Sequence, residues 1–435
     1  MEKRVSFAQA FALWARIGLM SFGGPAGQIA LMHRLLVEEK KWVDEARFLH
    51  AINYCMLLPG PEAQQLATYM GWHLHRTWGG IVAGTLFVLP GALVILALSI
   101  VYAGFHDVTL VTALFYGIKA AVLVIVIDAL RRIARRALRT GPLHAIAAAA
   151  FVAIFFLDLP FPLIILGAAA LGLLFVRRPV QAPGVAAVAD PAPPGLWRSL
   201  RVAIAFAALW LLPIAVMYLA LGPDHVFTEL GLFFSHMAMV TFGGAYAVLA
   251  YVGQEAVGHY GWLFPGEMLD GLGLAETTPG PLILVLQFVG FLAAFRDPGT
   301  LDPHVAGTLG AVITLWATFM PCFMWIFLGA PYMDRLRGNR RLDGALTAVT
   351  AAVVGVILNL ALWFALHVLF GSTAEERWFG LRLLVPDLSS LDPGVAVLSL
   401  AAAVMVFRLR LGMGWTLILS AAFGVLVHYA PGMLV

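Results

Sequence analysis

The sequence predicts an all-α polytopic membrane protein with about 13 transmembrane helices, arranged as two inverted (antiparallel) repeats with broken helices. Composition is the first observation. Of the 435 residues, 61% are hydrophobic and 12% are charged, whereas a soluble domain carries about 25% charged residues. The second is a series of apolar stretches, each long enough to cross a bilayer as a helix. The third is a set of glycine and proline motifs that occurs once in each half of the chain.

The apolar stretches are too long for transmembrane β-strands, which are segments of about ten residues with alternating polarity. The mean hydropathy of the chain is +0.90. We therefore expect helical spans, with loose edges, at residues 7–32, 48–71, 79–104, 108–130, 142–158, 160–177, 199–221, 227–253, 266–295, 304–330, 343–370, 393–409 and 411–430.

A stretch rich in proline and alanine separates the sixth and seventh predicted spans. Residues 178–198 contain five prolines, and such a composition cannot bury a hydrophobic core. The stretch is therefore expected to be a cytoplasmic linker. It would join an N-terminal membrane repeat, residues 1–177, to a C-terminal membrane repeat, residues 199–435.

Lysine and arginine in short loops predict the orientation, because such residues are enriched on the cytoplasmic side. A topology of about 13 crossings places four arginine clusters on that side, at residues 131–139, 177–201, 335–341 and 408–410. The N-terminus is then cytoplasmic and the C-terminus periplasmic. The loop at residues 33–47 fits less well, because it would lie outside yet carries four basic residues.

The repeated motifs have a constant spacing. Phe22-Gly23-Gly24-Pro25 returns as Phe242-Gly243-Gly244-Ala245, and Pro59-Gly60-Pro61 returns as Pro279-Gly280-Pro281, each 220 residues later. In the predicted topology the two copies are an odd number of crossings apart, so they would cross the bilayer in opposite directions. Segments interrupted at matching positions in two such halves are typical of the substrate site of a transporter.

Glycine and proline in these motifs predict that one half-helix ends and another begins. The start of a half-helix presents unpaired N–H groups and the positive end of the helix dipole, which together favour an anion. For a single motif, a kink or a close helix contact is the alternative. The candidate substrate-binding positions are Gly23, Gly24, Pro25, Pro59, Gly60, Pro61, Gly243, Gly244, Thr278, Pro279, Gly280 and Pro281.

Basic residues within the predicted spans are further candidates, because an arginine at the bilayer centre costs about 2.5–3.5 kcal/mol. Arg16 precedes the first glycine motif, and His236 has the matching place in the second half. Lys119 lies deep in the fourth span. Arg16 and Lys119 are candidates for binding an anion. The alternatives are snorkelling or a structural ion pair for Arg16, and a pair with a carboxylate within the membrane for Lys119. Asp128 is expected to pair with the arginines that follow it.

Polar residues beside the breaks complete the candidate site. Glu62 follows Pro61, and Glu276 shortly precedes Pro279. Both are proton-coupling candidates, because burial disfavours the charged form of a carboxylate. The alternative for Glu62 is an acidic first turn that complements its helix dipole. Gln28 is a candidate neutral donor to the substrate, with helix–helix hydrogen bonding as its alternative.

With these residues the chain resembles the chromate ion transporter family in its long, two-domain form. The resemblance covers essentially the whole chain and is carried by residues 21–30, 58–62, 71–90, 240–246 and 274–281. It implies a bacterial inner-membrane transporter that expels chromate, a tetrahedral dianion, and so confers chromate resistance. It also implies that the proton-motive force drives export, and that the first-half motif residues, with Arg16 as a basic match, contact the ion.

The second copy of the motifs departs from the first at two positions. Ala245 stands where the first half has Pro25, and His236 stands where it has Arg16. A histidine is often neutral at pH 7. We therefore expect the first half to contact the ion more tightly.

Other classes of function are weighed against this one. The spans contain no grouping of ligands at metal spacing and no nucleotide loop of the Walker type. An enzyme with catalytic residues, a metal site, a cofactor and an ATP-driven pump are therefore not expected. The net charge of +3 is too small to indicate a nucleic-acid partner. A passive anion channel and a carrier of sulfate or molybdate remain alternatives. The expected partners are chromate, sulfate as a further substrate, and the lipid bilayer; a homodimer is left open.

Overall fold

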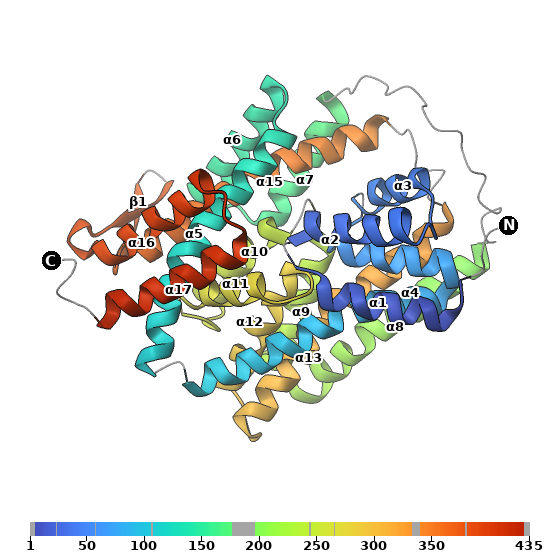
Figure 1. Cartoon of the computed structure of the whole chain (residues 1–435), viewed down its shortest axis with the longest axis horizontal. Helices are drawn as coiled ribbons and strands as arrows, with labels where there is room; N and C mark the ends of the chain where they lie inside the picture. Colours follow the sequence, from blue (N-terminus) through green and yellow to red (C-terminus); the bar gives the residue numbers. More distant parts are fainter. Residues whose placement is uncertain are drawn as a thin grey trace. The chain divides into compact units, whose positions relative to one another are not determined.

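The computed structural model describes residues 5–22, 24–56, 58–105, 108–175, 196–242, 245–264, 266–332, 340–378 and 381–429. Within these ranges the chain is almost entirely helical, as the sequence predicts (Figure 1). The first half contains α1 (Phe7–Met20), α2 (Gly24–His33), α3 (Glu45–Cys55), α4 (Glu62–Phe105), α5 (Thr109–Ala137), α6 (Gly141–Phe155) and α7 (Phe161–Phe175). The second half contains α8 (Leu196–Leu221), α9 (Val226–Val240), α10 (Ala245–Gln254), α11 (Glu267–Thr277), α12 (Val285–Arg296), α13 (Pro303–Gly329), α15 (Arg340–Leu369), α16 (Pro393–Ala403) and α17 (Met413–Tyr429).

Shorter elements complete the described chain. Three π-helical turns occupy Arg34–Glu39, Glu255–His259 and Val404–Arg408, and three 3₁₀ turns occupy Leu282–Leu284, Ala330–Tyr332 and Leu388–Ser390. An antiparallel hairpin, β1 (Thr373–Trp378) and β2 (Leu381–Pro386), lies in the loop before α16. The sequence analysis expected this loop but not its strands.

Five helical segments in the described residues are long and apolar enough to cross a membrane: Glu62–Phe105, Thr109–Ala137, Ser199–Leu221, Pro303–Tyr332 and Gly344–Leu369. The protein is therefore an all-α, multi-pass membrane protein. Other apolar helices are shorter. The 14 residues of α1 extend about 21 Å at 1.5 Å per residue, less than the roughly 30 Å of a bilayer core. The predicted spans that contain the glycine and proline motifs are thus each built from two shorter helices.

The first repeated motif breaks its helices in the same way in both halves. α1 ends at Met20 and α2 starts at Gly24, while α9 ends at Val240 and α10 starts at Ala245. At each end a hydroxyl donates to the carbonyl four residues earlier: Ser21 Oγ to Ile17 at 2.6 Å, and Thr241 Oγ1 to Met237 at 2.5 Å. Gly24 has φ +73°, a conformation that glycine adopts without steric cost. Gly23, Gly243 and Gly244 lie outside the described residues.

The Pro-Gly-Pro motifs break the chain a second time in each half. α3 ends at Cys55 and α4 starts at Glu62; α11 ends at Thr277 and a 3₁₀ turn starts at Leu282. The central glycines have φ +117° (Gly60) and +99° (Gly280). Side chains at such φ values are strained. The predicted helix breaks are therefore confirmed at both motifs.

The two motif types bind each other across the halves through reciprocal hydrogen bonds. The N–H of Gly60 donates to the carbonyl of Thr241 at 2.8 Å, and the N–H of Gly280 donates to the carbonyl of Ser21 at 2.8 Å. Each bond is the other with the halves exchanged, because Gly60 and Gly280, like Ser21 and Thr241, are 220 residues apart. A two-fold relation between two copies produces this pattern.

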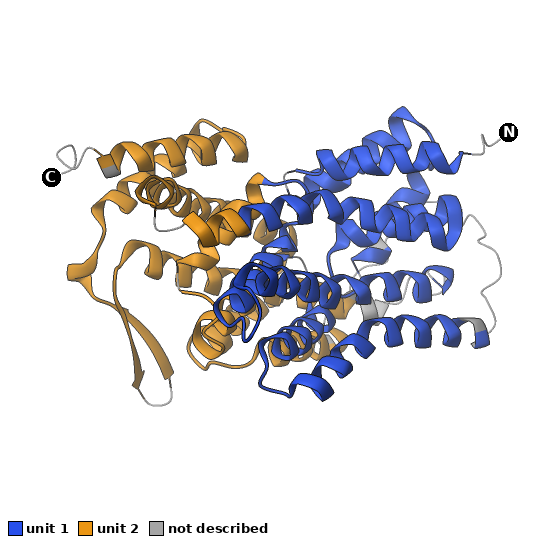
Figure 2. Ribbon diagram, turned by 90° about the horizontal axis from the view of Figure 1, so that it is seen from below, with its two compact units in different colours: residues 1–99, 177–245, 278–340 blue, residues 100–176, 246–277, 341–435 orange. Residues whose placement is uncertain are grey.

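By its contacts the chain divides into two compact units (Figure 2). Unit 1 comprises residues 1–99, 177–245 and 278–340, and unit 2 comprises residues 100–176, 246–277 and 341–435. Each unit takes segments from both predicted repeats. The described part of the predicted linker begins only at residue 196, where α8 starts.

In unit 1, α13 packs against α8, α9 and α12. The first part of α4 folds back on the second, because the backbone leaves helical geometry at His75 and Arg76. A Cβ atom added to Gly71 would collide with the carbonyl of Gly79 on the returning helix. The predicted spans 48–71 and 79–104 are therefore distinct, with the turn between them.

In unit 2, α5 packs against α11, α16 and α17. The α5–α17 contact depends on glycine: a Cβ on Gly117 would collide with the carbonyl of Ser420, and a Cβ on Gly424 would lie 2.5 Å from the carbonyl of Ala113. Small residues let membrane helices approach this closely, so that their backbones pack directly.

Replacing Gly117 by alanine is expected to destabilise the protein by about 1–3 kcal/mol, because the added methyl group forces α5 and α17 apart. Gly104→Ala is the matched control, since no atom lies within 4 Å of a Cβ at that helical glycine. Thermal unfolding of the two purified variants in detergent measures the difference. Equal midpoints for the two variants would contradict the close contact.

Candidate functional site

A small cavity in unit 1 lies where helices begin at the repeated motifs. We call it the helix-start cavity. Its volume is about 20 Å³, roughly the space of a single water molecule. The residues that line it are Pro25 and Gln28 of α2, Pro61, Glu62 and Ala63 at the start of α4, Ala245 at the start of α10, and Pro281, Leu282 and Ile283 before α12.

The cavity therefore lies at the starts of helical segments from both halves. The first N–H groups of a helix have no partner within the helix, and its dipole places partial positive charge there. Pro25 and Pro61 occupy the first turn or the residue before it, where the missing N–H of proline costs nothing. Such an arrangement favours an anion over a cation.

The glycine N–H groups of the Pro-Gly-Pro motifs are not available to an ion in this structure. The N–H groups of Gly60 and Gly280 are both donated to carbonyls of the opposite half. Both glycines are buried and neither lines the cavity. Their role here is to join the motifs, which revises the expectation that Gly60 presents its N–H to the substrate.

Gln28 fastens the same junction from the side chain. It is fully buried, and its Nε2 donates to the carbonyls of Gly280 at 2.7 Å and Ser21 at 3.3 Å. Its Oε1 has no hydrogen-bond partner among the described residues. Gln65 acts similarly within the first half, donating to the carbonyl of Pro59 at 2.7 Å. Gln28 thus holds the break and also lines the cavity.

Glu62 is the ionisable residue among those that line the helix-start cavity. It is half-buried, at the first position of α4. No hydrogen bond or ion pair joins its carboxylate to another residue of the described chain. The position agrees with both sequence interpretations, because it is in the first turn of the helix and also faces the candidate site.

The structure places Arg16 and His236 outside this cavity. Both side chains are exposed, on α1 and α9 respectively, and neither lines the cavity. Arg16 has no ion pair with any residue in the described ranges. An exposed arginine on a membrane helix must reach water or a lipid headgroup.

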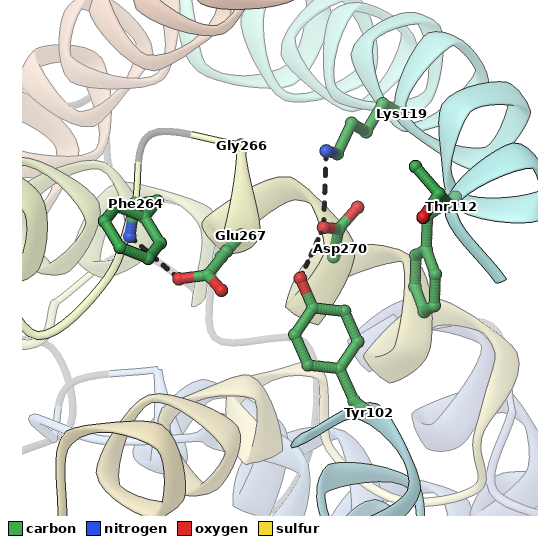
Figure 3. Close-up of a pocket in the computed structure, with 8 residues that line it drawn as sticks. Tyr102, Thr112, Lys119, Phe264, Gly266, Glu267 and Asp270 are labelled. Carbon is green, nitrogen blue, oxygen red and sulfur yellow. Dashed lines mark hydrogen bonds and ion pairs between the residues drawn. The ribbon is translucent and has the colours of Figure 1, made fainter. Parts of the chain in front are cut away.

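Lys119 lies in a second cavity, in unit 2, which we call the Lys119 cavity (Figure 3). Its Nζ is 3.4 Å from Oδ2 of Asp270, a carboxylate that is only 4% exposed. The alternative expected for Lys119, a pair with a carboxylate within the membrane, is thus what the structure contains. Sequence reasoning did not single out Asp270, although an acidic residue within a predicted span was a signal for it.

Glu276 is also paired. The hydroxyl of Tyr246 donates to its Oε1 at 2.6 Å, and the carboxylate is buried within unit 2. Thr278 is buried, and the carbonyl of Pro279 lies against Gly91 of α4. Tyr246 follows the second glycine motif directly, yet its sequence position alone did not indicate its partner.

Asp128 pairs with Arg131 at 3.4 Å and Arg132 at 3.2 Å, as predicted. Among the described residues, no three histidine, cysteine, aspartate or glutamate side chains are grouped closely enough to hold a metal ion.

Comparison with known proteins identifies the family. A model of the family described as "Chromate transporter" matches residues 8–173 and 228–425, which include both pairs of motifs. The chain belongs to the chromate transporter family. The unmatched residues between the two stretches include the predicted linker. No solved structure matches this chain significantly.

Several relatives in the chromate transporter family are similar over most of their length. A chromate transport protein of Pseudomonas aeruginosa is 33% identical over 362 residues, covering 81% of this chain and 80% of the relative. A chromate transport protein of Cupriavidus metallidurans is 30% identical over 350 residues, with 80% of each chain covered. A probable chromate transport protein of Synechococcus elongatus is 28% identical over 356 residues, covering 81% of this chain and 83% of the relative.

Replacing Tyr246 by phenylalanine is expected to destabilise the protein by about 1–3 kcal/mol, because it removes a donor from the buried Glu276. Tyr218→Phe is the matched control. Tyr218 is 46% exposed on α8, so its hydroxyl can bond to solvent. Unfolding midpoints of the two purified variants provide the measurement, and a Tyr246→Phe midpoint equal to that of the control would contradict the role of this hydrogen bond.

Proposed function

We propose that the protein is a secondary transporter that exports chromate from the bacterial cytoplasm across the inner membrane and so confers chromate resistance. The main support is membership of the chromate transporter family, together with relatives named chromate transport proteins that match four-fifths of the chain. The helix-start cavity supports an anionic substrate independently, because helix starts of both halves meet there.

The membrane potential suits this direction of transport. Moving one elementary charge across 100 mV is worth about 2.3 kcal/mol, and a dianion gains about twice that on leaving a cell whose interior is negative. We therefore propose that the proton-motive force drives export. Glu62 and Glu276 are candidates for coupling the movement of protons to that of the ion.

We propose that two inverted repeats of about 13 spans in total carry out alternating access, with the N-terminus cytoplasmic and the C-terminus periplasmic. The reciprocal bonds of Gly60 and Gly280 support a two-fold relation between the halves. Local structure supports it as well. Lys41 and Gly261, 220 residues apart, have φ +53° and +64°, each after a π-helical turn.

We propose that chromate binds in an enlarged form of the helix-start cavity. A cavity of about 20 Å³ is too small for a tetrahedral ion with five heavy atoms, so this conformation corresponds to a closed state. Movement of one repeat against the other would widen the cavity and free the N–H groups of Gly60 and Gly280. Arg16 would contribute by reaching the ion on its path, and Lys119 by leaving Asp270.

Uptake of labelled chromate into everted membrane vesicles tests this function. We expect uptake that requires energised vesicles and is competed weakly by sulfate. Uptake that persists without any gradient and shows single-channel currents would indicate a passive channel. Sulfate or molybdate uptake faster than chromate uptake would indicate a carrier of another tetrahedral oxyanion.

Replacing Gly60 by valine is expected to abolish chromate uptake without loss of membrane insertion. Valine cannot adopt φ +117° without strain, and its Cβ would lie 2.7 Å from Sγ of Cys322. Gly167→Val is the matched control, since a Cβ at Gly167 meets no atom within 4 Å. Wild-type uptake by the Gly60 variant would contradict the need for a broken helix.

Replacing Arg16 by glutamine is expected to lower chromate uptake by about tenfold, because one charge that attracts the dianion is lost. Arg16→Lys keeps the charge and should retain most of the activity. Vesicle uptake is normalised to the amount of protein in the membrane. Wild-type rates for Arg16→Gln would remove this residue from the transport path.

A further inference from the structure

The Lys119 cavity holds a buried ion pair that the proposed binding site for chromate does not need (Figure 3). Its volume is about 200 Å³, enough for several water molecules. Lys119 and Thr112 come from α5, Tyr102 from the end of α4, and Glu267 and Asp270 from the start of α11. All of these residues belong to unit 2.

Asp270 has one occupied and one empty carboxylate oxygen. Its Oδ2 accepts the hydroxyl hydrogen of Tyr102 at 2.8 Å and lies 3.4 Å from Nζ of Lys119. Its Oδ1 is buried and has no hydrogen-bond partner among the described residues. An unpartnered oxygen on a buried carboxylate costs free energy. A proton added to Oδ1 would neutralise the group without displacing either existing partner.

The charges that line the cavity favour uptake of a cation as small as a proton. Lys119 contributes one positive charge, and Glu267 and Asp270 contribute two negative charges. The carboxylate of Glu267 accepts the backbone N–H of Phe264 at 2.8 Å, which fixes it as a helix cap. Of the two carboxylates, Asp270 is therefore the one with a free acceptor, and one added proton makes the lining neutral.

Lys119 has room to respond when Asp270 changes charge. Its side chain is 30% exposed, and its ammonium group lies 2.8 Å from where a Cβ of residue 266 would stand. Because residue 266 is glycine, that space is open to the ammonium group. Neutralising Asp270 removes the attraction that holds Nζ beside it.

We propose that Asp270 is the carboxylate at which this transporter binds and releases its coupling proton. The inference rests on the proposed function, in which proton movement is linked to chromate export. In the binding step, a proton carried by cavity water forms a bond to Oδ1, and the carboxylate becomes a neutral acid. Tyr102 keeps its hydrogen bond to Oδ2, and Lys119 keeps its own proton but loses its counter-charge. Return of the proton to water reverses the step.

The titratable groups that face Asp270 come from three elements. They are Lys119 from α5, Tyr102 from the end of α4, and Glu267 from its own helix. α17 also packs on α11, but none of its described residues lines the cavity. Proton binding at Asp270 is therefore set by one cation, one phenol and one second carboxylate.

Asp270 fits this role better than Glu62 or Glu276. The carboxylate of Glu62 faces a cavity with space for about one water molecule, and at the start of a helix its charged form is favoured by the dipole. Glu276 is buried against Tyr246 and does not line either cavity. Asp270 alone of the three combines a free oxygen, a cationic partner and a cavity that can hold a chain of water.

Two assays on the full-length protein in proteoliposomes test the proposal. Exchange of labelled for unlabelled chromate across the membrane needs no net proton movement, whereas a pH-sensitive dye reports protons moved during net chromate transport. Asp270→Asn should lower the chromate-linked proton flux at least about tenfold, while exchange stays within about threefold of wild type. Glu376→Gln, at an exposed position of β1, is the matched control and should leave both readouts unchanged.

Lys119→Gln gives a second, independent measurement. Without the nearby ammonium group, Asp270 holds its proton more strongly, so the pH profile of net transport should move to higher pH. This variant decides the matter if Asp270→Asn does not reach the membrane.

The outcomes separate the inference from the function on which it rests. Wild-type proton flux in Asp270→Asn, or an unchanged pH profile in Lys119→Gln, would overturn the role of Asp270. Loss of exchange together with proton flux in Asp270→Asn would also overturn it, because a structural role affects both. Chromate exchange without any proton flux in the wild type, or flux that requires sodium instead, would remove proton coupling. No chromate exchange by the wild type would refute the proposed function itself.

Discussion

The reciprocal hydrogen bonds of Gly60 with Thr241 and of Gly280 with Ser21 are the constraint on which the centre of unit 1 depends. Within a bilayer, a broken helix is tolerated only where its freed backbone groups find other partners. Here each break supplies what the other lacks, because a glycine N–H of one half meets a carbonyl of the opposite half. Gln28 adds a third connection from its side chain. The helix starts that line the cavity are therefore held together by the breaks that create them.

Much of the fold follows from local sequence signals. Hydrophobic stretches predict the helices, and glycine and proline predict where they break, because these residues act on the backbone directly. The hairpin of β1 and β2 was not predicted, since its strands are short and largely exposed and carry no clear alternation. The reversal of α4 at His75 and Arg76 was anticipated only as a gap between spans. Its geometry depends on Gly71 and Gly79 packing backbone to backbone, a tertiary effect that propensity does not contain.

The candidate site was predictable to the extent that it repeats. The constant spacing brought Pro25, Pro61 and Pro281 into one hypothesis, and all three line the same cavity. Lys119 and Asp270 are outside the repeated motifs, and their pairing arises from the packing of α5 on α11. The sequence therefore indicated that Lys119 needs an anionic partner but not which one. Likewise, it did not show that the N–H of Gly60 was already engaged.

The exchange of backbone bonds also bears on how such a protein is assembled. A polypeptide carrying only one half would leave the N–H of its own Pro-Gly-Pro glycine and the carbonyl that precedes its glycine motif both unpaired within the membrane. Neither half is self-sufficient, so the halves must meet before either break becomes stable. Joining them in one chain guarantees equal numbers and a high effective concentration of each for the other. A gene encoding a single half would have to obtain the missing partners from a second polypeptide, and the two-fold pattern of the bonds makes another copy of the same half a geometrically suitable source.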